Sequence, residues 1–177
     1  MSLQATASST DVAPQASSAI ADVTSGSLRA LDYIAFAIDD DQYGVDIMAV
    51  REIKGWTDVT HLPGQPEYVR GVLNLRGSVV PIVDLRCRFG QGLTRATPLH
   101  IVIIVQIGSR PIGLLADRVL DIVSCDNAKI QPVPQIAAGE RLRFLSGLMS
   151  ADRGMIALID LPNLLPNEPP GAPDMAA

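Results

Sequence analysis

Few side chains in this sequence have the types and spacing that catalysis or metal binding requires. The two histidines, His61 and His100, have no serine, cysteine or carboxylate at a recognisable catalytic distance along the chain. Cys87 and Cys125 lie far apart and belong to no Cys-x-x-Cys or Cys/His cluster. We therefore expect structural histidines and two small buried thiols, with a disulfide as the alternative for the cysteines.

The acidic run at 39–41 is equally unlike a ligand site. It lacks the alternating ligands and the closing glutamate of a calcium loop, so a solvated hairpin turn is the better interpretation. Glycines occur singly rather than in a loop that could hold phosphate. We expect a protein that is not an enzyme and that has no metal site and no cofactor.

One charged pair does call for an explanation. Arg76 follows Leu75 in an apolar stretch and should be at least partly buried, so it needs a partner. Glu52 stands in the otherwise apolar segment 50–53 and has the same need. We expect the two to pair across neighbouring strands, because a guanidinium presents a planar set of donors to a carboxylate. The alternative is a solvent-facing Arg76 without a special partner.

The residues around Arg76 indicate a turn. Asn74 should cap or bridge the backbone of a loop, whereas Gly71 and Gly77 mark places that need a positive φ or a close approach of the backbone.

Composition and charge narrow the class of protein. The chain has 177 residues, 47% of them hydrophobic, which is enough for a substantial core. A net charge of -5 without a basic run argues against nucleic acid as a partner. No apolar run approaches the length of a membrane span, and the start does not resemble a signal peptide, so we expect a cytoplasmic protein without direct membrane insertion.

The two ends differ from the middle. Residues 1–30 are rich in Ala, Ser and Thr, and residues 166–177 are rich in proline and small residues, so we expect a disordered arm and a disordered tail. In the folded part, 31–165, short β-branched segments between turn signals favour strands. Ten are predicted: 33–38, 43–47, 50–53, 71–75, 79–85, 100–107, 112–116, 119–123, 145–149 and 155–161. Short helices are predicted at 66–69, 85–89 and 161–165.

The two halves of the folded part repeat. Tyr43-Gly44 corresponds to Ile112-Gly113 at a shift of 69 residues, and Asp84-Leu85 corresponds to Asp160-Leu161 at a shift of 76. The alternative is a chance match between apolar strands. Asp121 and Asp152 stand at the positions of Glu52 and Arg76, so the second half does not reproduce the ion pair. A duplicated five-strand unit predicts a mostly β protein with two small barrels side by side and a groove between them.

A family resemblance is carried by residues 71–85, GVLNLRGSVVPIVDL. This string resembles the G-x-x-N-L-R-G-x-x-x-P-x-x-D-L signature of CheW-like chemotaxis coupling proteins at every fixed position. Segments 43–47, 50–53, 113–119 and 147–161 also match the family in order, so the resemblance covers nearly all of 31–165. It implies two five-stranded SH3-like barrels, at about 31–95 and 96–165, with short connecting helices and a chain that can cross between the barrels.

The resemblance also implies a function. Such adaptors link the cytoplasmic tip of chemoreceptors to the regulatory domain of the histidine kinase CheA, support array assembly and control the kinase, so the protein would be recruited to membrane-associated receptor arrays. An apolar groove suits the helical receptor tip. The residues expected to line it are Val45, Ile47, Val50, Gly71, Leu115, Ala116 and Val119, although the alternation of strands requires some of them to be core.

Two other functions stay open. The first is a scaffold of the same fold in a non-flagellar receptor-kinase pathway, for surface motility or gene regulation, which would share every motif. The second is a β-barrel that binds a small ligand, which would need a pocket with converging polar groups.

Overall fold

The computed structural model describes residues 30–134 and 139–165. The tail expected at 166–177 and all but the last residue of the arm expected at 1–30 lie outside this part. Ala30 itself is the first residue of a strand and pairs with Asp126.

The described part is mostly β. Its strands are β1 (Ala30–Ile38), β2 (Asp41–Asp46), β3 (Val50–Gly55), β4 (Val69–Leu75), β5 (Ser78–Asp84), β6 (Ile101–Ile107), β7 (Arg110–Ala116), β8 (Arg118–Asp126), β9 (Leu145–Ala151) and β10 (Gly154–Ile159). The helical segments are η1 (Ile47–Ala49), α1 (Leu85–Arg88), η2 (Asn127–Lys129), η3 (Glu140–Phe144) and α2 (Leu161–Leu164). Every predicted strand is present, so the predicted mostly β fold is confirmed.

Two of the three predicted short helices are present, and each begins at an aspartate cap. Asp84 and Asp160 cap α1 and α2 by accepting hydrogen bonds from the backbone amides of Cys87 and Asn163. The helix predicted at 66–69 is wrong. A single turn, closed by a hydrogen bond from the Val69 amide to the Pro66 carbonyl, leads straight into β4 there.

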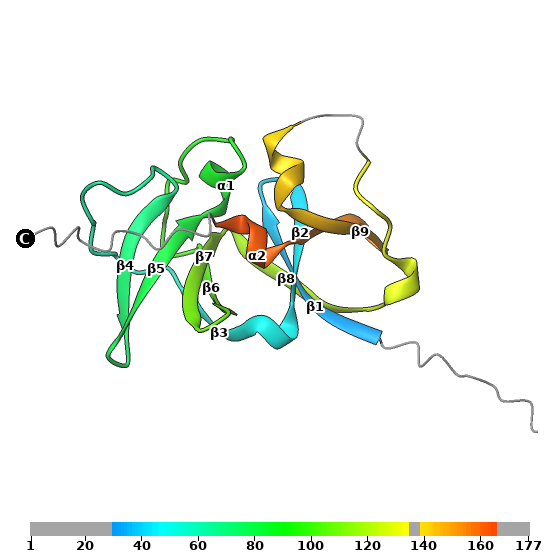
Figure 1. The fold of residues 1–177 in the computed structure, drawn as a ribbon, viewed down its shortest axis with the longest axis horizontal. Coiled ribbons are helices and arrows are strands. Elements are labelled where there is room, and N and C mark those ends of the chain that lie inside the picture. The colour runs from blue at the N-terminus through cyan, green and yellow to red at the C-terminus, as the bar shows by residue number, and fades with distance from the viewer. Residues whose placement is uncertain (1–29, 135–138, 166–177) are drawn as a thin grey trace, which may run out of the picture.

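The strands form two five-stranded sheets (Figure 1). One has the order β3-β6-β7-β5-β4, and we call it the continuous barrel because it uses only residues 50–116. The other has the order β8-β1-β2-β10-β9, and we call it the split barrel because its strands come from both ends of the described chain. The sheets are therefore not divided near residue 95. The chain crosses between them at η1 and again at Asp117, a possibility that the sequence left open.

Strand pairing reproduces the internal repeat. Phe36 pairs with Tyr43 as Val105 pairs with Ile112, each 69 positions on. The parallel contact of Gly44 with Leu158 is repeated by Gly113 with Ile82. The irregularity at the start of β8, opposite β1, recurs at the start of β3, opposite β6. Each barrel thus combines two strands of one repeat with three strands of the other.

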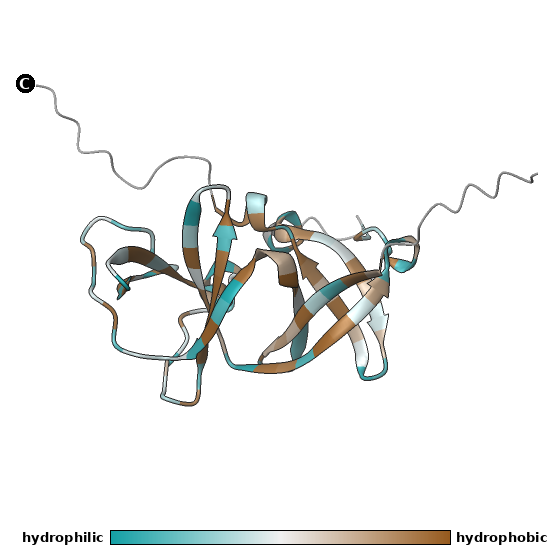
Figure 2. Cartoon of the chain, turned by 90° about the horizontal axis from the view of Figure 1, so that it is seen from below, coloured by the Kyte–Doolittle hydropathy of each residue, from teal (hydrophilic) through white to brown (hydrophobic). Residues whose placement is uncertain are grey.

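The two barrels share a core. One cluster of buried side chains joins Phe36 and Val45 of the split barrel to Val83, Ile103 and Leu114 of the continuous barrel. Two smaller clusters lie within the continuous and the split barrel respectively. Figure 2 shows hydrophobic and hydrophilic bands alternating along the strands, as the pleat requires. A shared core makes the barrels one packed unit.

Candidate protein-interaction site

Arg76 lies in a hairpin turn rather than in a strand. It occupies the β4–β5 turn with a φ of 51°, followed by Gly77 with a φ of 86°. Two successive positive φ angles are typical of the tight turns that match the twist of a hairpin. The Asn74 side chain accepts a hydrogen bond from the Gly77 amide at 2.9 Å and so caps this turn. Leu75, the last residue of β4, packs partly buried against the core of the continuous barrel.

The ion pair expected from the sequence is present, but its setting differs. Arg76 Nη2 donates to Glu52 Oε2 at 2.8 Å. The Arg76 side chain is 87% exposed and that of Glu52 is 29% exposed, so the expectation of a partly buried arginine was wrong. The strands β3 and β4 are also not neighbours but the two outer strands of one sheet. Arg76 lies in a turn, so the alternation of inward and outward side chains along a strand does not apply to it. Its side chain extends to Glu52 on β3, at the other edge of the sheet.

Gly71 closes the continuous barrel. The segment after β3 returns to the sheet, where Thr60 pairs with Val72 of β4. A Cβ on Gly71 would lie 2.4 Å from the Thr60 carbonyl oxygen, and the φ of Gly71 is 140°. Gly71 is therefore needed for this close approach and does not present a side chain to a partner. Gly147 and Gln131 play the corresponding part in the split barrel, where Gln131 pairs with Leu148.

The apolar residues expected to line a groove fall into two groups. Val45, Leu115 and Ala116 are at most 2% exposed and belong to the core, so they have no surface to offer a partner. Ile47 and Val50 are half-buried against the shared core, and Val119 is 37% exposed. Val50 begins β3 and Val119 is the second residue of β8, so both follow a crossover between the barrels.

Sequence reasoning missed several further exposed apolar residues in the described part of the chain, and four of them are related by the repeat. Ile53 and Val79 lie on β3 and β5, and Ile122 and Met155 are their counterparts on β8 and β10 in the second repeat. These side chains are between 40% and 64% exposed. The repeat would have indicated them, because an apolar residue recurs in both halves directly after the Glu52 position and again three residues after the Arg76 position. Asp121, at the Glu52 position, accepts a hydrogen bond from the amide of its neighbour Ile122.

The other candidate functional groups are possible metal ligands and the two cysteines. Within residues 30–134 and 139–165 no group of three or more His, Cys, Asp or Glu side chains is arranged to hold a metal ion. Cys87 and Cys125 are free thiols, so the alternative of a disulfide is ruled out here. Cys125 is buried, but Cys87 is only half-buried; burial and then the negative charge of Asp84 raise the pKa of its thiol.

A cavity of about 510 Å³ lies at the end of β8. It is lined mainly by small side chains, with Lys129 and Asp126 paired at 3.3 Å and the Cys125 thiol donating to the Asp126 carbonyl. The charged groups at this cavity neutralise each other instead of converging on a ligand. In the described part of the chain, no helix combines the length and the apolar character needed to cross a bilayer.

The structure is thus a β protein of two five-stranded barrels that exchange strands, with apolar residues and an ion pair exposed at the surface. The family model described as "CheW-like domain" matches residues 32–168, and the chain belongs to this family. It is 44% identical to the chemotaxis protein CheW of Rhizobium meliloti over 77% of this chain and 88% of that protein. It is 35% identical to the chemotaxis protein CheW of Klebsiella aerogenes, over 77% and 82% of the two chains. The crystal structure of the scaffolding protein TtCheW from Thermoanaerobacter tengcongensis has a TM-score of 0.70 and 32% identity, covering 77% of this chain and 88% of that one.

Proposed function

We propose that this chain is an adaptor that couples the cytoplasmic tip of a chemoreceptor to the regulatory domain of the histidine kinase CheA. Membership of the CheW-like family supports this proposal, since several relatives are chemotaxis proteins and one is a scaffolding protein. In this role the protein works by contact between surfaces and carries out no catalysis. Its place in the cell would be at membrane-associated receptor arrays.

The observation that carries the proposal is that Val50 and Val119, which stand 69 residues apart at equivalent positions of the repeat, are both apolar and not fully buried. These half-buried or exposed apolar residues stand at equivalent positions of the two repeats, and each follows a crossover between the barrels. An apolar surface formed where two elements meet is a suitable complement for the apolar face of a helix. Ile47, in the crossover η1, extends the same set. We therefore place the receptor contact at these three residues and leave Val45, Leu115 and Ala116 to the core.

The exposed ion pair is close in sequence to the proposed contact, because Glu52 lies two residues after Val50 on β3. Arg76 uses one guanidinium nitrogen for Glu52, and its 87% exposed side chain leaves other N–H groups directed to solvent. A guanidinium in this position can donate to a carboxylate or a backbone carbonyl of a partner. Apolar contacts with a polar rim are the usual composition of a protein interface.

Co-sedimentation with receptor-bearing membranes, with and without the kinase, tests the proposal. An adaptor should pellet with receptor membranes and should increase the amount of kinase that pellets with them. Failure to bind either partner, tested across the receptors and kinases of the source organism, would overturn the proposal. Recovery of a receptor-kinase set unconnected with swimming would instead favour the same scaffold in a non-flagellar pathway.

A further inference from the structure

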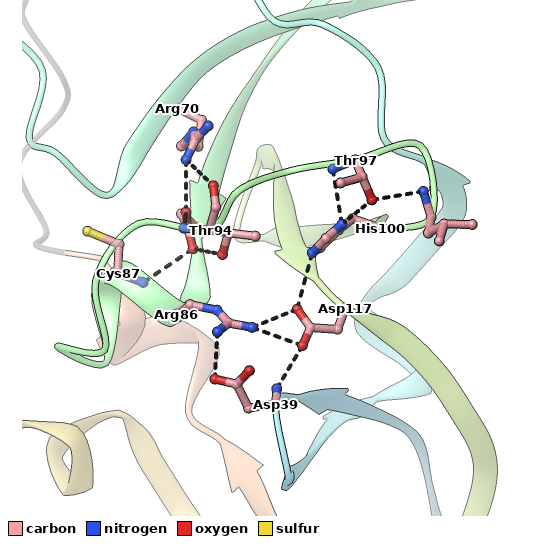
Figure 3. Close-up of polar contacts among 10 residues, drawn as sticks. Asp39, Arg70, Arg86, Cys87, Thr94, Thr97, His100 and Asp117 are labelled. Carbon is pink, nitrogen blue, oxygen red and sulfur yellow. Dashed lines mark hydrogen bonds and ion pairs between the residues drawn. The ribbon is translucent and has the colours of Figure 1, made fainter.

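Residues of both barrels hold Asp117, the single residue between β7 of the continuous barrel and β8 of the split barrel (Figure 3). On the side of the split barrel, the Asp39 amide donates to Asp117 Oδ2 at 2.7 Å and the Asp117 amide donates to the Ala37 carbonyl at 3.0 Å. On the other side, Arg86 Nη2 donates to both Asp117 carboxylate oxygens, at 3.1 and 3.0 Å, and His100 Nε2 lies 3.5 Å from Oδ1. Arg86 Nη1 also donates to the Asp39 carboxylate at 2.6 Å. One guanidinium of α1 therefore bridges two acids at the second crossover.

Arg86 projects from a helix whose own start is firmly held. Asp84, which is 0% exposed, caps α1 by accepting from the Cys87 amide at 3.2 Å. Its carboxylate also accepts from the Thr94 amide at 2.8 Å and from the Thr94 hydroxyl at 2.7 Å, and Arg70 Nη1 donates to it at 3.2 Å (Figure 3). A buried carboxylate resists the loss of such donors, because its charge would be left unsatisfied. Arg86 therefore connects Asp117 to a fixed part of the continuous barrel.

This connection ends two residues before Val119, a residue of the proposed receptor contact. Val119 stands opposite Phe36 of β1, and side chains opposite each other in an antiparallel pair project to the same face of the sheet. Phe36 belongs to the shared core, so Val119 lies at the outer strand of the split barrel on the face that this core covers. The position of Asp117 therefore determines where Val119 lies relative to the continuous barrel.

The internal repeat does not reproduce this connection. Met48 stands 69 positions before Asp117, and its apolar side chain is 82% exposed. Pro162 stands 76 positions after Arg86 and has no side-chain donor. The connection therefore belongs to the second crossover and is not a property of the repeat.

We infer that Arg86 is a positioning residue for the receptor contact. The Arg86 side chain is 21% exposed and that of Asp117 is 18% exposed, so the ion pair is shielded from solvent far more than the pair of Arg76 with Glu52. Arg86 acts through Asp117 and holds Val119 in place before a receptor helix binds. A contact that is already in place loses less freedom on binding, which favours affinity. The inference rests on the proposed adaptor function, whereas the position of Val119 can be measured without a receptor.

NMR spectroscopy of valine methyl groups in the full chain tests the positioning by itself. Arg86→Lys keeps the positive charge but loses the planar set of donors that binds both oxygens of a carboxylate. The methyl signals of Val119 should shift and broaden in this variant, whereas those of Val50 should not. Arg88→Lys is a matched control on the same helix, where Arg88 Nε donates to the Leu164 carbonyl at 2.7 Å, and it should leave the Val119 signals in place. Unchanged Val119 signals in Arg86→Lys would overturn the inference.

Co-sedimentation with receptor-bearing membranes tests the effect on binding. Arg86→Lys should lower the affinity by about fivefold, both in the otherwise unchanged chain and in a Val50→Ala background, which lies within the usual range of coupling between residues of one network. In a Val119→Ala background the same change should lower the affinity by less than about twofold, because the side chain that Arg86 positions has been truncated. Equal losses in the two backgrounds would indicate a general structural role and would overturn the inference.

A second variant covers the case in which Arg86→Lys does not fold. Asp117→Asn keeps the shape of the side chain but removes the charge that Arg86 binds, so it should produce the same changes in the Val119 signals and in binding. Absence of both changes in folded Asp117→Asn would overturn the inference. Failure of the unchanged chain to bind any receptor membrane would overturn the proposed adaptor function, and the Val119 signals would still decide whether Arg86 positions this residue.

Discussion

Arg76 and Glu52 form a 2.8 Å ion pair that joins the turn after β4 to β3, the strand at the opposite edge of the same sheet. The pair spans the place where the continuous barrel closes, next to the backbone pairing of Thr60 with Val72. Its arginine is almost fully exposed, so water and salt screen the attraction. The pair is therefore better suited to orienting a guanidinium for a partner than to stabilising the fold.

A double-mutant cycle measures how much the Arg76–Glu52 pair contributes to stability. Arg76→Ala, Glu52→Ala and the double variant should give a coupling free energy of about 0.2–1 kcal/mol in urea unfolding, the usual range for an exposed pair. In Arg76→Ala the free energy of receptor binding should fall by more than the free energy of unfolding, because the variant also loses the exposed guanidinium donors. A coupling of several kcal/mol would contradict the exposed geometry.

Val50→Glu tests the proposed receptor contact. A carboxylate at this half-buried position would be desolvated by a bound helix, so affinity for receptor membranes should fall by about tenfold or more. Leu93→Glu, a matched change at an exposed apolar residue in the loop after α1, should bind as the unchanged protein does. Thermal unfolding of both variants separates binding from folding. Normal binding by a folded Val50→Glu protein would remove Val50 from the site.

Gly71→Ala should destabilise the protein by roughly 2–3 kcal/mol, because the added Cβ meets the Thr60 carbonyl and the φ of 140° strains an alanine. Gly55→Ala is the control, since its Cβ would meet nothing within 4 Å. Urea unfolding of the two variants decides the matter. Equal stability of the two would show that the approach of Thr60 to β4 is looser in solution.

Alkaline pH should weaken the fold through Tyr43. Burial, and next the negative charge of Asp41, raise the pKa of this phenol above its ordinary value of 10.0, against an opposing contribution from Arg141. The folded state thus resists loss of the proton, and this stabilisation is complete below pH 10.0 and lost as pH rises above it. Tyr43→Phe should make the unfolding free energy fall less steeply above that pH. An unchanged slope would contradict the buried environment, although Tyr33, whose pKa is also raised by burial, should leave part of the slope in place.

Local patterns predicted the strands and the repeat, but not how the strands combine. The run Ile101–Ile107 is a strand by composition, yet nothing in it specifies that its partners are β3 and β7. Exposure was hardest to predict at turns: apolar residues on both sides of Arg76 suggested burial, whereas the positive φ turns its side chain outward. Burial was also mispredicted within strands. Val45 and Leu115 were expected to line a groove, but their strands are covered on both faces because the barrels share a core.

The exchange of strands has a consequence for how such a chain can be recombined. A chimera of two relatives joined near residue 95 would keep each repeat intact. Each barrel would then combine strands from both relatives, since each barrel draws on both repeats. Exchange of residues 50–116 would instead transplant one complete barrel with its own small core, and would have to match only the shared interface. The repeat unit and the unit that can be transplanted are therefore different segments of the chain.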